Sequence, residues 1–215
     1  MERNIIKLGD SLELLKQIPS ESIDCIITDP PYGTKTNQRD SFMVGEFSNI
    51  MPLILPELFR VLKNDGCFYC FTSWSMMSDW LLRYQQYFKL QNIIVWDKQR
   101  HSGCYSSQSW QFTWEGIFYG IKGKRKIVKY MPDVITSNEK GKRVAMQKPV
   151  DILIKLMEAS TNEGDLILDP FMGSGSTAVA CKTARRDFIG FEINPKFKDM
   201  AENRLKELDS KPKLF

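Results

Sequence analysis

Residues 165–178 read DLILDPFMGSGSTA, and this stretch decides the fold of the chain. Its apolar residues predict a buried strand that ends at Asp169. Gly173, Gly175 and Ala178 then have the spacing of a glycine-rich turn that opens a helix. Glycines allow such a turn to be sharp and allow a ligand to approach the backbone closely. The stretch therefore predicts a nucleotide-binding turn between a strand and a helix.

The same alternation of short apolar runs and longer helical patterns continues along the chain. Most of the short runs are continuous, which is typical of strands buried on both faces. The predicted strands are residues 5–8, 23–28, 67–71, 93–96, 116–121, 166–168 and 188–191. The predicted helices are residues 12–17, 49–62, 76–87, 149–159, 176–183 and 195–208. This order predicts an α/β fold in which helices cover both faces of an open, mostly parallel sheet, with an antiparallel pair of strands at its edge.

Acidic residues that follow predicted strands indicate what the turn binds. Asp10, Asp169 and Glu192 have this position, and Glu192 is placed to accept hydrogen bonds from two ribose hydroxyls. Acids repel a pyrophosphate but suit hydroxyls, an ammonium and a sulfonium. The chain has no Walker-type phosphate loop, and too little chain follows the turn for a second nucleotide-binding half. These features predict S-adenosylmethionine as the ligand, with a turn that binds nothing as the alternative.

A second motif, Asp29-Pro30-Pro31-Tyr32, follows the strand predicted at residues 23–28. Prolines fix the backbone and leave carbonyl oxygens without competing N–H donors. The Asp29 carboxylate and the Pro30 carbonyl can each accept one N–H of an amino group on a nucleic-acid base. Tyr32 offers a flat face on which a flipped base stacks. The alternative is an ordinary turn at the end of a strand.

The composition is that of a globular protein. The 215 residues carry a net charge of +4, and 42% of them are hydrophobic, which predicts one domain, 1–215. No apolar run is long enough for a membrane span and no signal-peptide pattern is present, so we expect an intracellular, cytoplasmic protein. The chain has five cysteines and one histidine, and two of the cysteines form a lone CxxC in a predicted buried strand. This pattern favours neither a disulfide framework nor a metal site.

With these motifs the chain resembles, over nearly its whole length, the amino-group DNA methyltransferases of bacteria and their phages. Residues 29–32 match the catalytic motif of this family and residues 169–177 its cofactor loop; this permuted order is that of the family's beta group. The resemblance implies that the catalytic residues are Asp29, Pro30, Pro31 and Tyr32. It implies that the cofactor-binding residues are Asp10, Asp29, Lys148, Asp169, Pro170, Phe171, Gly173, Ser174, Gly175, Ser176, Thr177, Glu192 and Asn194.

The resemblance also implies a fold and a substrate. The family fold is a seven-stranded sheet, parallel except for one strand, and the predicted strands agree with it. The implied substrate is DNA with its target base flipped out, and N6 of adenine is favoured because family members with Asp at the first motif position mostly modify adenine. The basic segment 122–147 corresponds to a short target-recognition insert, and residues 144–146 lack the His-Pro-Thr that the family commonly has there. A homodimer that completes recognition and a partner restriction nuclease are further expectations.

Basic residues in and beside that insert are candidates for contacts with DNA phosphates, the alternative being a solvated surface. They are Lys35, Arg39, Lys98, Arg100, Lys122, Lys124, Arg125 and Lys126. Other functions stay open at this point. Methylation of cytosine N4 or of RNA would use the same local chemistry, and a non-catalytic cofactor- or DNA-binding module would keep the same motifs. A dinucleotide-dependent oxidoreductase would leave the Asp29 motif unexplained.

Overall fold

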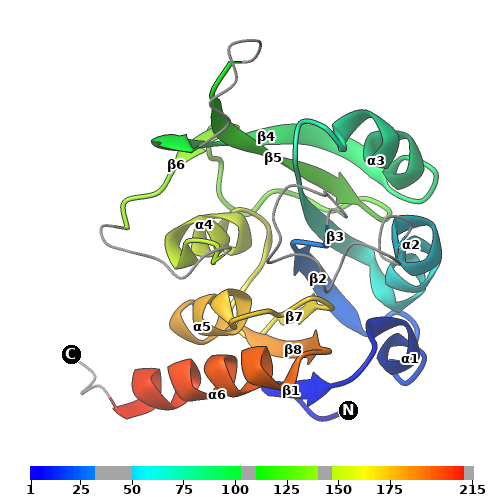
Figure 1. The fold of residues 1–215 in the computed structure, drawn as a ribbon. Coiled ribbons are helices and arrows are strands. Elements are labelled where there is room, and N and C mark those ends of the chain that lie inside the picture. Colours follow the sequence, from blue (N-terminus) through cyan, green and yellow to red (C-terminus); the bar gives the residue numbers. More distant parts are fainter. Residues whose placement is uncertain (32–49, 103–109, 140–146, 211–215) are drawn as a thin grey trace.

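The computed structural model describes residues 1–31, 50–102, 110–139 and 147–210 (Figure 1). The strands are β1 (Ile5–Leu8), β2 (Ile23–Thr28), β3 (Leu62–Thr72), β4 (Lys89–Ser102), β5 (Phe112–Ile121), β6 (Val134–Thr136), β7 (Leu166–Asp169) and β8 (Asp187–Glu192). The helices are α1 (Ser11–Leu15), α2 (Ile50–Val61), α3 (Met77–Tyr84), α4 (Val150–Ser160), α5 (Ser176–Thr183) and α6 (Pro195–Ser210). Each predicted strand and helix overlaps one of these elements. None of the described helices combines the length and the hydropathy that a membrane crossing requires.

The strands form one sheet in the order β1-β8-β7-β2-β3-β5-β4-β6. Only β5 is antiparallel to its neighbours, β3 and β4; every other pair is parallel. The predicted α/β fold with a mostly parallel sheet is therefore confirmed. Two details of the prediction are wrong. The sheet has eight strands rather than seven, and its edge beyond the antiparallel β4–β5 pair is β6. Three-residue β6 lies in the segment expected as an insert, and it is too short to give an apolar pattern of its own.

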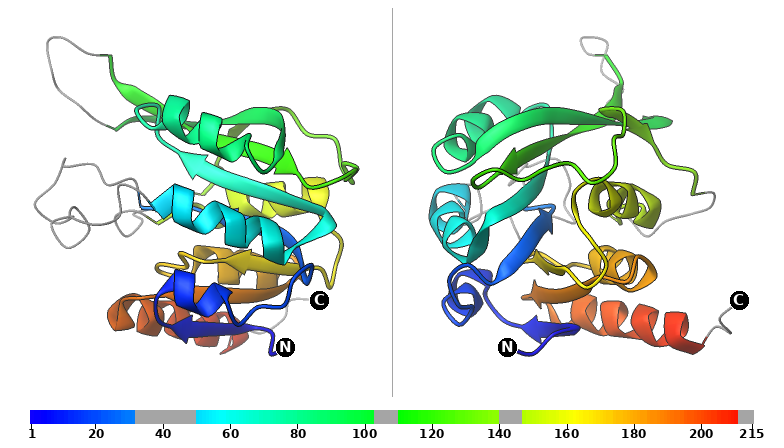
Figure 2. Two further views of the ribbon diagram at one scale, coloured as in Figure 1. Left: turned by 90° about the vertical axis from the view of Figure 1, so that its right-hand side faces the viewer. Right: turned by 180° about the vertical axis from the view of Figure 1, so that it is seen from behind.

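Helices cover both faces of the sheet, as the two views in Figure 2 show. On one face α1, α2 and α3 pack through residues such as Leu15, Leu58 and Tyr84. On the other face α4, α5 and α6 pack through Leu156 and Ala201 among others. Full burial of each large apolar side chain contributes roughly 1.5–3 kcal/mol, so these two layers hold the sheet rigid behind the edge where ligands bind.

Strands from distant parts of the sequence lie side by side in this sheet. β2 pairs with β7 through Cys25 opposite Ile167, and β1 pairs with β8 through Ile5 opposite Ile189. The central strands β2, β7 and β8 are buried along nearly their whole length, which accounts for their continuous apolar sequences. Because they run in the same direction, their carboxyl ends open onto one edge of the sheet.

Candidate active site

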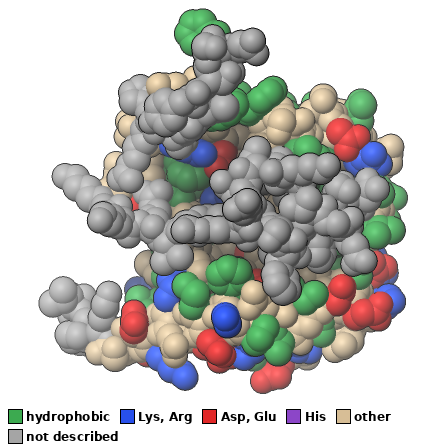
Figure 3. Space-filling model, viewed as in Figure 1, with side chains coloured by type: hydrophobic (Ala, Val, Ile, Leu, Met, Phe, Trp, Pro, Cys, Tyr) green, Lys and Arg blue, Asp and Glu red, His purple; other side chains and the backbone are tan. Residues whose placement is uncertain are grey.

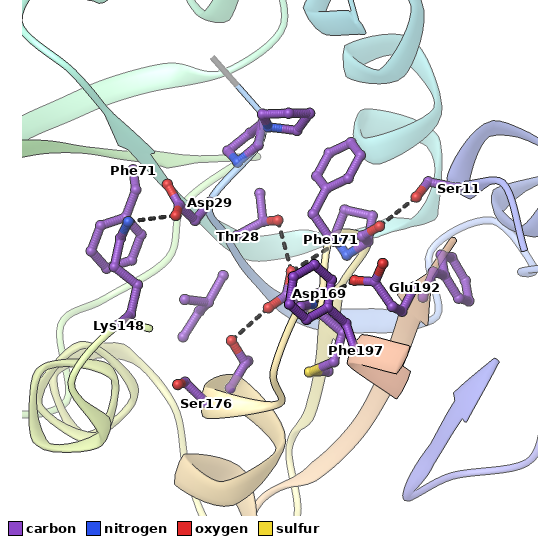
Figure 4. Close-up of a pocket in the computed structure, with 18 of the residues that line it drawn as sticks. Ser11, Thr28, Asp29, Phe71, Lys148, Asp169, Phe171, Ser176, Glu192 and Phe197 are labelled. Carbon is purple, nitrogen blue, oxygen red and sulfur yellow. Dashed lines mark hydrogen bonds and ion pairs between the residues drawn. The ribbon is translucent and has the colours of Figure 1, made fainter. Parts of the chain in front are cut away.

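The carboxyl ends of β2, β7 and β8 surround one pocket (Figure 4). Ligands of open α/β sheets bind at this edge because loops from adjacent strands diverge there. Asp29 directly follows β2, while Asp169 and Glu192 are the last residues of β7 and β8. The structure also brings these predicted site residues to the pocket: Asp10, Pro30, Pro31, Lys148, Pro170, Phe171, Gly173, Ser174, Ser176 and Thr177.

Asp169 is the buried hub of the site, with only 3% of its surface exposed. Its Oδ1 accepts hydrogen bonds from the Thr28 hydroxyl at 2.7 Å and from the Phe171 amide at 3.0 Å, and its Oδ2 accepts one from the Thr177 hydroxyl at 2.5 Å. Burial raises the pKa of Asp169 to about 6, although these hydrogen bonds act in the opposite direction. The carboxylate therefore ties β2, the glycine turn and the start of α5 together, and it serves the architecture of the pocket.

The glycine turn has the left-handed backbone that its sequence predicts. Gly173 has φ 53° and Gly175 has φ 83°. A Cβ on Gly175 would stand 2.6 Å from the Cβ of Ala201, so this glycine also allows α6 to pack against the turn. A Cβ on Gly173 would meet nothing closer than 4.0 Å, because Gly173 lines the pocket. Arg204 on α6 completes the turn by donating to the carbonyl oxygen of Ser174 at 2.7 Å.

Glu192 presents a carboxylate to the pocket while the turn holds it in place. Its Oε2 accepts a hydrogen bond from the Gly173 amide at 2.7 Å, and its Oε1 accepts one from the Asn194 amide at 2.8 Å. A carboxylate oxygen has more than one acceptor site, so both oxygens can still accept from ligand hydroxyls. Asn194 and Asp10, by contrast, act as helix caps. Asn194 Oδ1 accepts from the Lys196 amide at 3.0 Å at the start of α6, and Asp10 Oδ1 accepts from the Leu12 amide at 2.7 Å at the start of α1.

Asp29 lies at the other end of the pocket, in contact with the ammonium group of Lys148 (Figure 4). Lys148 Nζ also lies 3.2 Å from Oε2 of Glu115 on β5, and Lys98 Nζ on β4 lies 2.6 Å from Oε1 of the same residue. Burial lowers the pKa of Lys148, but the carboxylates of Asp29 and Glu115 outweigh burial and leave that pKa above its ordinary value. Lys148 therefore remains a cation. Figure 3 shows basic, acidic and hydrophobic side chains side by side in a recess on this face of the molecule.

Aromatic and aliphatic side chains form the remaining walls. Phe171, Phe197 and Ile193 stand near Glu192, and Phe71 stands near Asp29 (Figure 4). Carboxylates suit ribose hydroxyls and a cationic group, and flat apolar walls suit an adenine ring. The carboxylates and the apolar walls of the pocket therefore fit S-adenosylmethionine, the ligand expected from the sequence, better than a pyrophosphate.

The structure does not bring all the expected DNA contacts to this pocket. Lys122 Nζ donates to the carbonyl oxygens of Phe59 and Leu62, and Arg125 donates to those of Ser160 and Asp65. These partners lie at the amino ends of the parallel strands, the edge opposite the pocket. Lys122 and Arg125 therefore have a structural role at this edge, and the DNA contacts expected of them stay a prediction.

Other expected site residues have other outcomes. Lys124 and Lys126 follow the same segment and are exposed. Lys98 reaches the pocket region through Glu115. Tyr32, Lys35, Arg39 and the side chain of Arg100 lie outside the described residues.

An α/β sheet whose acid-ended strands surround a pocket with a glycine turn defines an enzyme that uses a nucleotide-containing cofactor. Residues 23–138 and 130–203 match the N6_N4_Mtase family, described as DNA methylase. The chain belongs to this family.

Named relatives extend this result. The type II methyltransferase M2.LlaDCHI of Lactococcus lactis subsp. cremoris is 31% identical, over 95% of this chain and 90% of its own length. The DNA adenine methyltransferase YhdJ of Escherichia coli (strain K12) is 28% identical, over 95% of this chain and 83% of its own length. The crystal structure of the M1.HpyAVI–SAM complex superposes with a TM-score of 0.72 at 27% identity, covering 93% of this chain and 98% of that one.

Several residues in the pocket or beside it carry no sequence signal that would have revealed them. Glu115 stands in a strand whose register decides what its side chain meets, and Phe197 stands near the start of α6. Thr28 is one residue before Asp29, so its proximity to the motif was the one available clue. The pairing of Lys148 with Asp29 joins residues 119 positions apart, and no local pattern encodes it.

Proposed function

We propose that this chain transfers the methyl group of S-adenosylmethionine to the N6 amino group of adenine in DNA. The observation that carries the proposal is the position of Asp29, at the mouth of the same pocket that Asp169 and Glu192 line. Membership of the DNA methylase family supports the reaction class, and the SAM complex of M1.HpyAVI supports the cofactor.

The cofactor half of the pocket binds and orients S-adenosylmethionine. Glu192 accepts hydrogen bonds from the ribose hydroxyls, and Phe171, Phe197 and Ile193 enclose the adenine ring. Gly173 leaves room for the ligand beside the turn. When bound, S-adenosylmethionine supplies a methyl group made electrophilic by its sulfonium.

The substrate half of the pocket holds the amino group of a flipped base. The Asp29 carboxylate and the Pro30 carbonyl each accept one N–H, which takes the nitrogen lone pair out of conjugation with the ring. Tyr32, which lies outside the described residues, stacks on the base. As the nitrogen bonds to the methyl carbon, the bond between that carbon and the sulfonium sulfur breaks, and the nitrogen becomes more positive until it releases one N–H proton. The negative charge on Asp29 stabilises the positive charge that develops. Positioning and electrostatics therefore carry the reaction, without a covalent enzyme intermediate.

Exposed aromatic residues indicate where DNA approaches. β5 runs past the carboxyl end of β3, where Gly116 pairs with Thr72, so its first residues extend beyond the pocket edge. Trp110, just before β5, is 93% exposed, and Trp74 is 55% exposed while its ring stacks on Phe112 at 5.5 Å. Such faces stack on unpaired bases. We propose that this edge, rather than the opposite one, faces DNA.

The test is transfer of a labelled methyl group to unmethylated DNA, followed by digestion and identification of the labelled nucleoside. Label in N6-methyl-2′-deoxyadenosine supports the full proposal. Label in N4-methyl-2′-deoxycytidine corrects the base alone, because the family includes both chemistries by name. Thermal stabilisation by S-adenosylhomocysteine without any transfer to DNA would overturn the proposed substrate.

A further inference from the structure

Glu115 is a largely buried acid to which the proposed reaction assigns no role. Its side chain is 17% exposed and lies between two lysines: Lys98 Nζ stands 2.6 Å from Oε1, and Lys148 Nζ stands 3.2 Å from Oε2. Oε2 accepts no hydrogen bond from the described residues, so its contact with Lys148 is an ionic one. Burial raises the pKa of Glu115, but Lys148 and Lys98 outweigh burial and hold that pKa below its ordinary value. Glu115 is therefore a carboxylate.

These residues form a row of alternating charges, which we call the ion chain: Lys98, Glu115, Lys148 and Asp29. The members come from β4, from β5, from the segment before α4 and from the end of β2. Lys148 also lies over the Phe71 ring, with Nζ 5.2 Å from the ring centroid, so the middle of the ion chain is shielded from water. In such surroundings each charge acts strongly on its neighbours.

The sign of each charge matters for a reaction at Asp29. A base amino nitrogen becomes more positive during methylation, and Asp29 favours this change while the adjacent Lys148 cation opposes it. Glu115 offsets Lys148 from the other side. Without that carboxylate, the remaining members Lys98, Lys148 and Asp29 would carry a net positive charge beside the reacting nitrogen.

We propose that Glu115 is a positioning residue for methyl transfer, which holds Lys148 and offsets its charge so that Asp29 keeps its negative field at the substrate. This inference rests on the proposed function of Asp29, but it does not depend on which base is methylated.

The test compares two substitutions of Glu115. Glu115→Gln keeps the shape and removes the charge, whereas Glu115→Asp keeps the charge and shortens the side chain. We expect Glu115→Gln to lower kcat roughly 10- to 100-fold and to leave KM for S-adenosylmethionine within about threefold. We expect Glu115→Asp to retain more kcat than Glu115→Gln. A role in packing alone predicts the reverse order, and that order would overturn the proposal.

A second pair of variants covers the case in which Glu115→Gln does not fold. Glu115→Gln combined with Lys148→Met removes one negative and one positive charge, so the net charge of the ion chain stays as in the wild type, with Lys98 and Asp29 remaining. Compared with Lys148→Met alone, the added glutamine should change kcat by less than about threefold, because Glu115 acts through Lys148. A further tenfold loss in the double variant would overturn the proposal.

A matched control and the readout separate this inference from the proposed function. Glu158→Gln breaks a lysine–glutamate pair that Glu158 forms with Lys129 at 2.7 Å, where both side chains are well exposed, and it should keep full kcat. The readout is total label transferred to DNA. Failure of the wild-type chain to label DNA contradicts the proposed function, whereas an active wild type with an equally active Glu115→Gln contradicts this inference alone.

Discussion

Thr28 donates its hydroxyl hydrogen to Oδ1 of Asp169 at 2.7 Å, although the two residues stand 141 positions apart in the sequence. Thr28 is the last residue of β2 and directly precedes Asp29, while Asp169 is the last residue of β7 and opens the glycine turn. One buried hydrogen bond thus fixes the proposed catalytic motif relative to the proposed cofactor loop. The same bond gives Asp169 an architectural role, and its contact with the cofactor stays a prediction.

The raised pKa of Asp169 gives stability a defined dependence on pH. Its pKa is about 6 in the folded chain, against an ordinary value of 3.8, so between these values the folded chain keeps a proton that the unfolded chain releases. The stabilisation from this proton is complete below pH 3.8 and is lost as the pH rises through 6. Relative to Asp169→Asn, the wild type should lose on the order of 3 kcal/mol of unfolding free energy across this window, and nothing more above it. Urea unfolding of both proteins from pH 4 to 7.5 measures the difference, and a wild type that gains unfolding free energy relative to Asp169→Asn as the pH rises would contradict the assignment.

The two turn glycines should respond differently to alanine. Gly175→Ala forces a Cβ to within 2.6 Å of Ala201 at φ 83°, so we expect a loss of roughly 1–3 kcal/mol and a lower melting temperature. Gly173→Ala meets open space at φ 53°, so its stability loss should be nearer 1 kcal/mol, while its methyl group occupies room that the cofactor needs. Calorimetry with S-adenosylhomocysteine should show the larger affinity loss for Gly173→Ala. Equal effects of both variants on melting and on affinity would be inconsistent with these separate roles.

Asp29→Ala should separate catalysis from cofactor binding. Removal of the carboxylate takes away an acceptor for the substrate amino group and its negative charge, so we expect methyl transfer to fall by roughly 10³ or more. Affinity for S-adenosylhomocysteine should stay within about threefold, since Glu192 and the aromatic walls remain. Asp24→Ala is the matched control: Asp24 lies near the other end of β2 and pairs with Lys63 at 2.6 Å, so its loss should reduce stability and leave kcat unchanged. Near-normal turnover of Asp29→Ala would refute the proposed chemistry.

Arg125 and Lys126 are adjacent in sequence but should differ in effect. The Arg125 side chain is 12% exposed, and it donates to the Ser160 carbonyl at 2.8 Å and contacts Asp165 at 3.1 Å. Arg125→Ala should therefore cost about 2–4 kcal/mol of unfolding free energy, without changing how DNA affinity depends on salt. Lys126→Ala should leave stability within about 0.5 kcal/mol. A shallower salt dependence of DNA binding in Arg125→Ala would restore the phosphate contact that the structure argues against.

The central strands could be predicted from the sequence because burial on both faces leaves a continuous apolar run with sharp ends. β2 has the predicted bounds for this reason. β4 extends well beyond its apolar residues 93–96, because pairing with β5 satisfies its backbone groups whatever the side chains are. β6 is a strand because its backbone pairs with β4. Three residues are too few to carry a sequence pattern that predicts such a partner.

The site residues likewise fall into those that the sequence predicts and those that it does not. Asp29, Asp169 and Glu192 could be located because acids at the ends of parallel strands must share an edge. Glu115 could not, since its partners depend on the register of β5 against β3 and β4. The basic residues Lys122 and Arg125 lie in a segment with the composition of a phosphate-binding strip. Only the fold reveals that both side chains donate hydrogen bonds to backbone carbonyl oxygens.

The position of β8 between β1 and β7 has a consequence for how the chain folds during its synthesis. Among the described strands β1 is made first, and its one partner among them is β8, made about 180 residues later. At ribosomal rates of 5–20 residues per second, β1 waits on the order of ten seconds or more without that strand beside it. Meanwhile the edge of β2 that later pairs with β7 leaves backbone N–H and C=O groups unpaired. The nascent chain therefore carries its Asp29 motif long before it has a pocket, and an open strand edge of this kind can pair with other chains until the last strands dock.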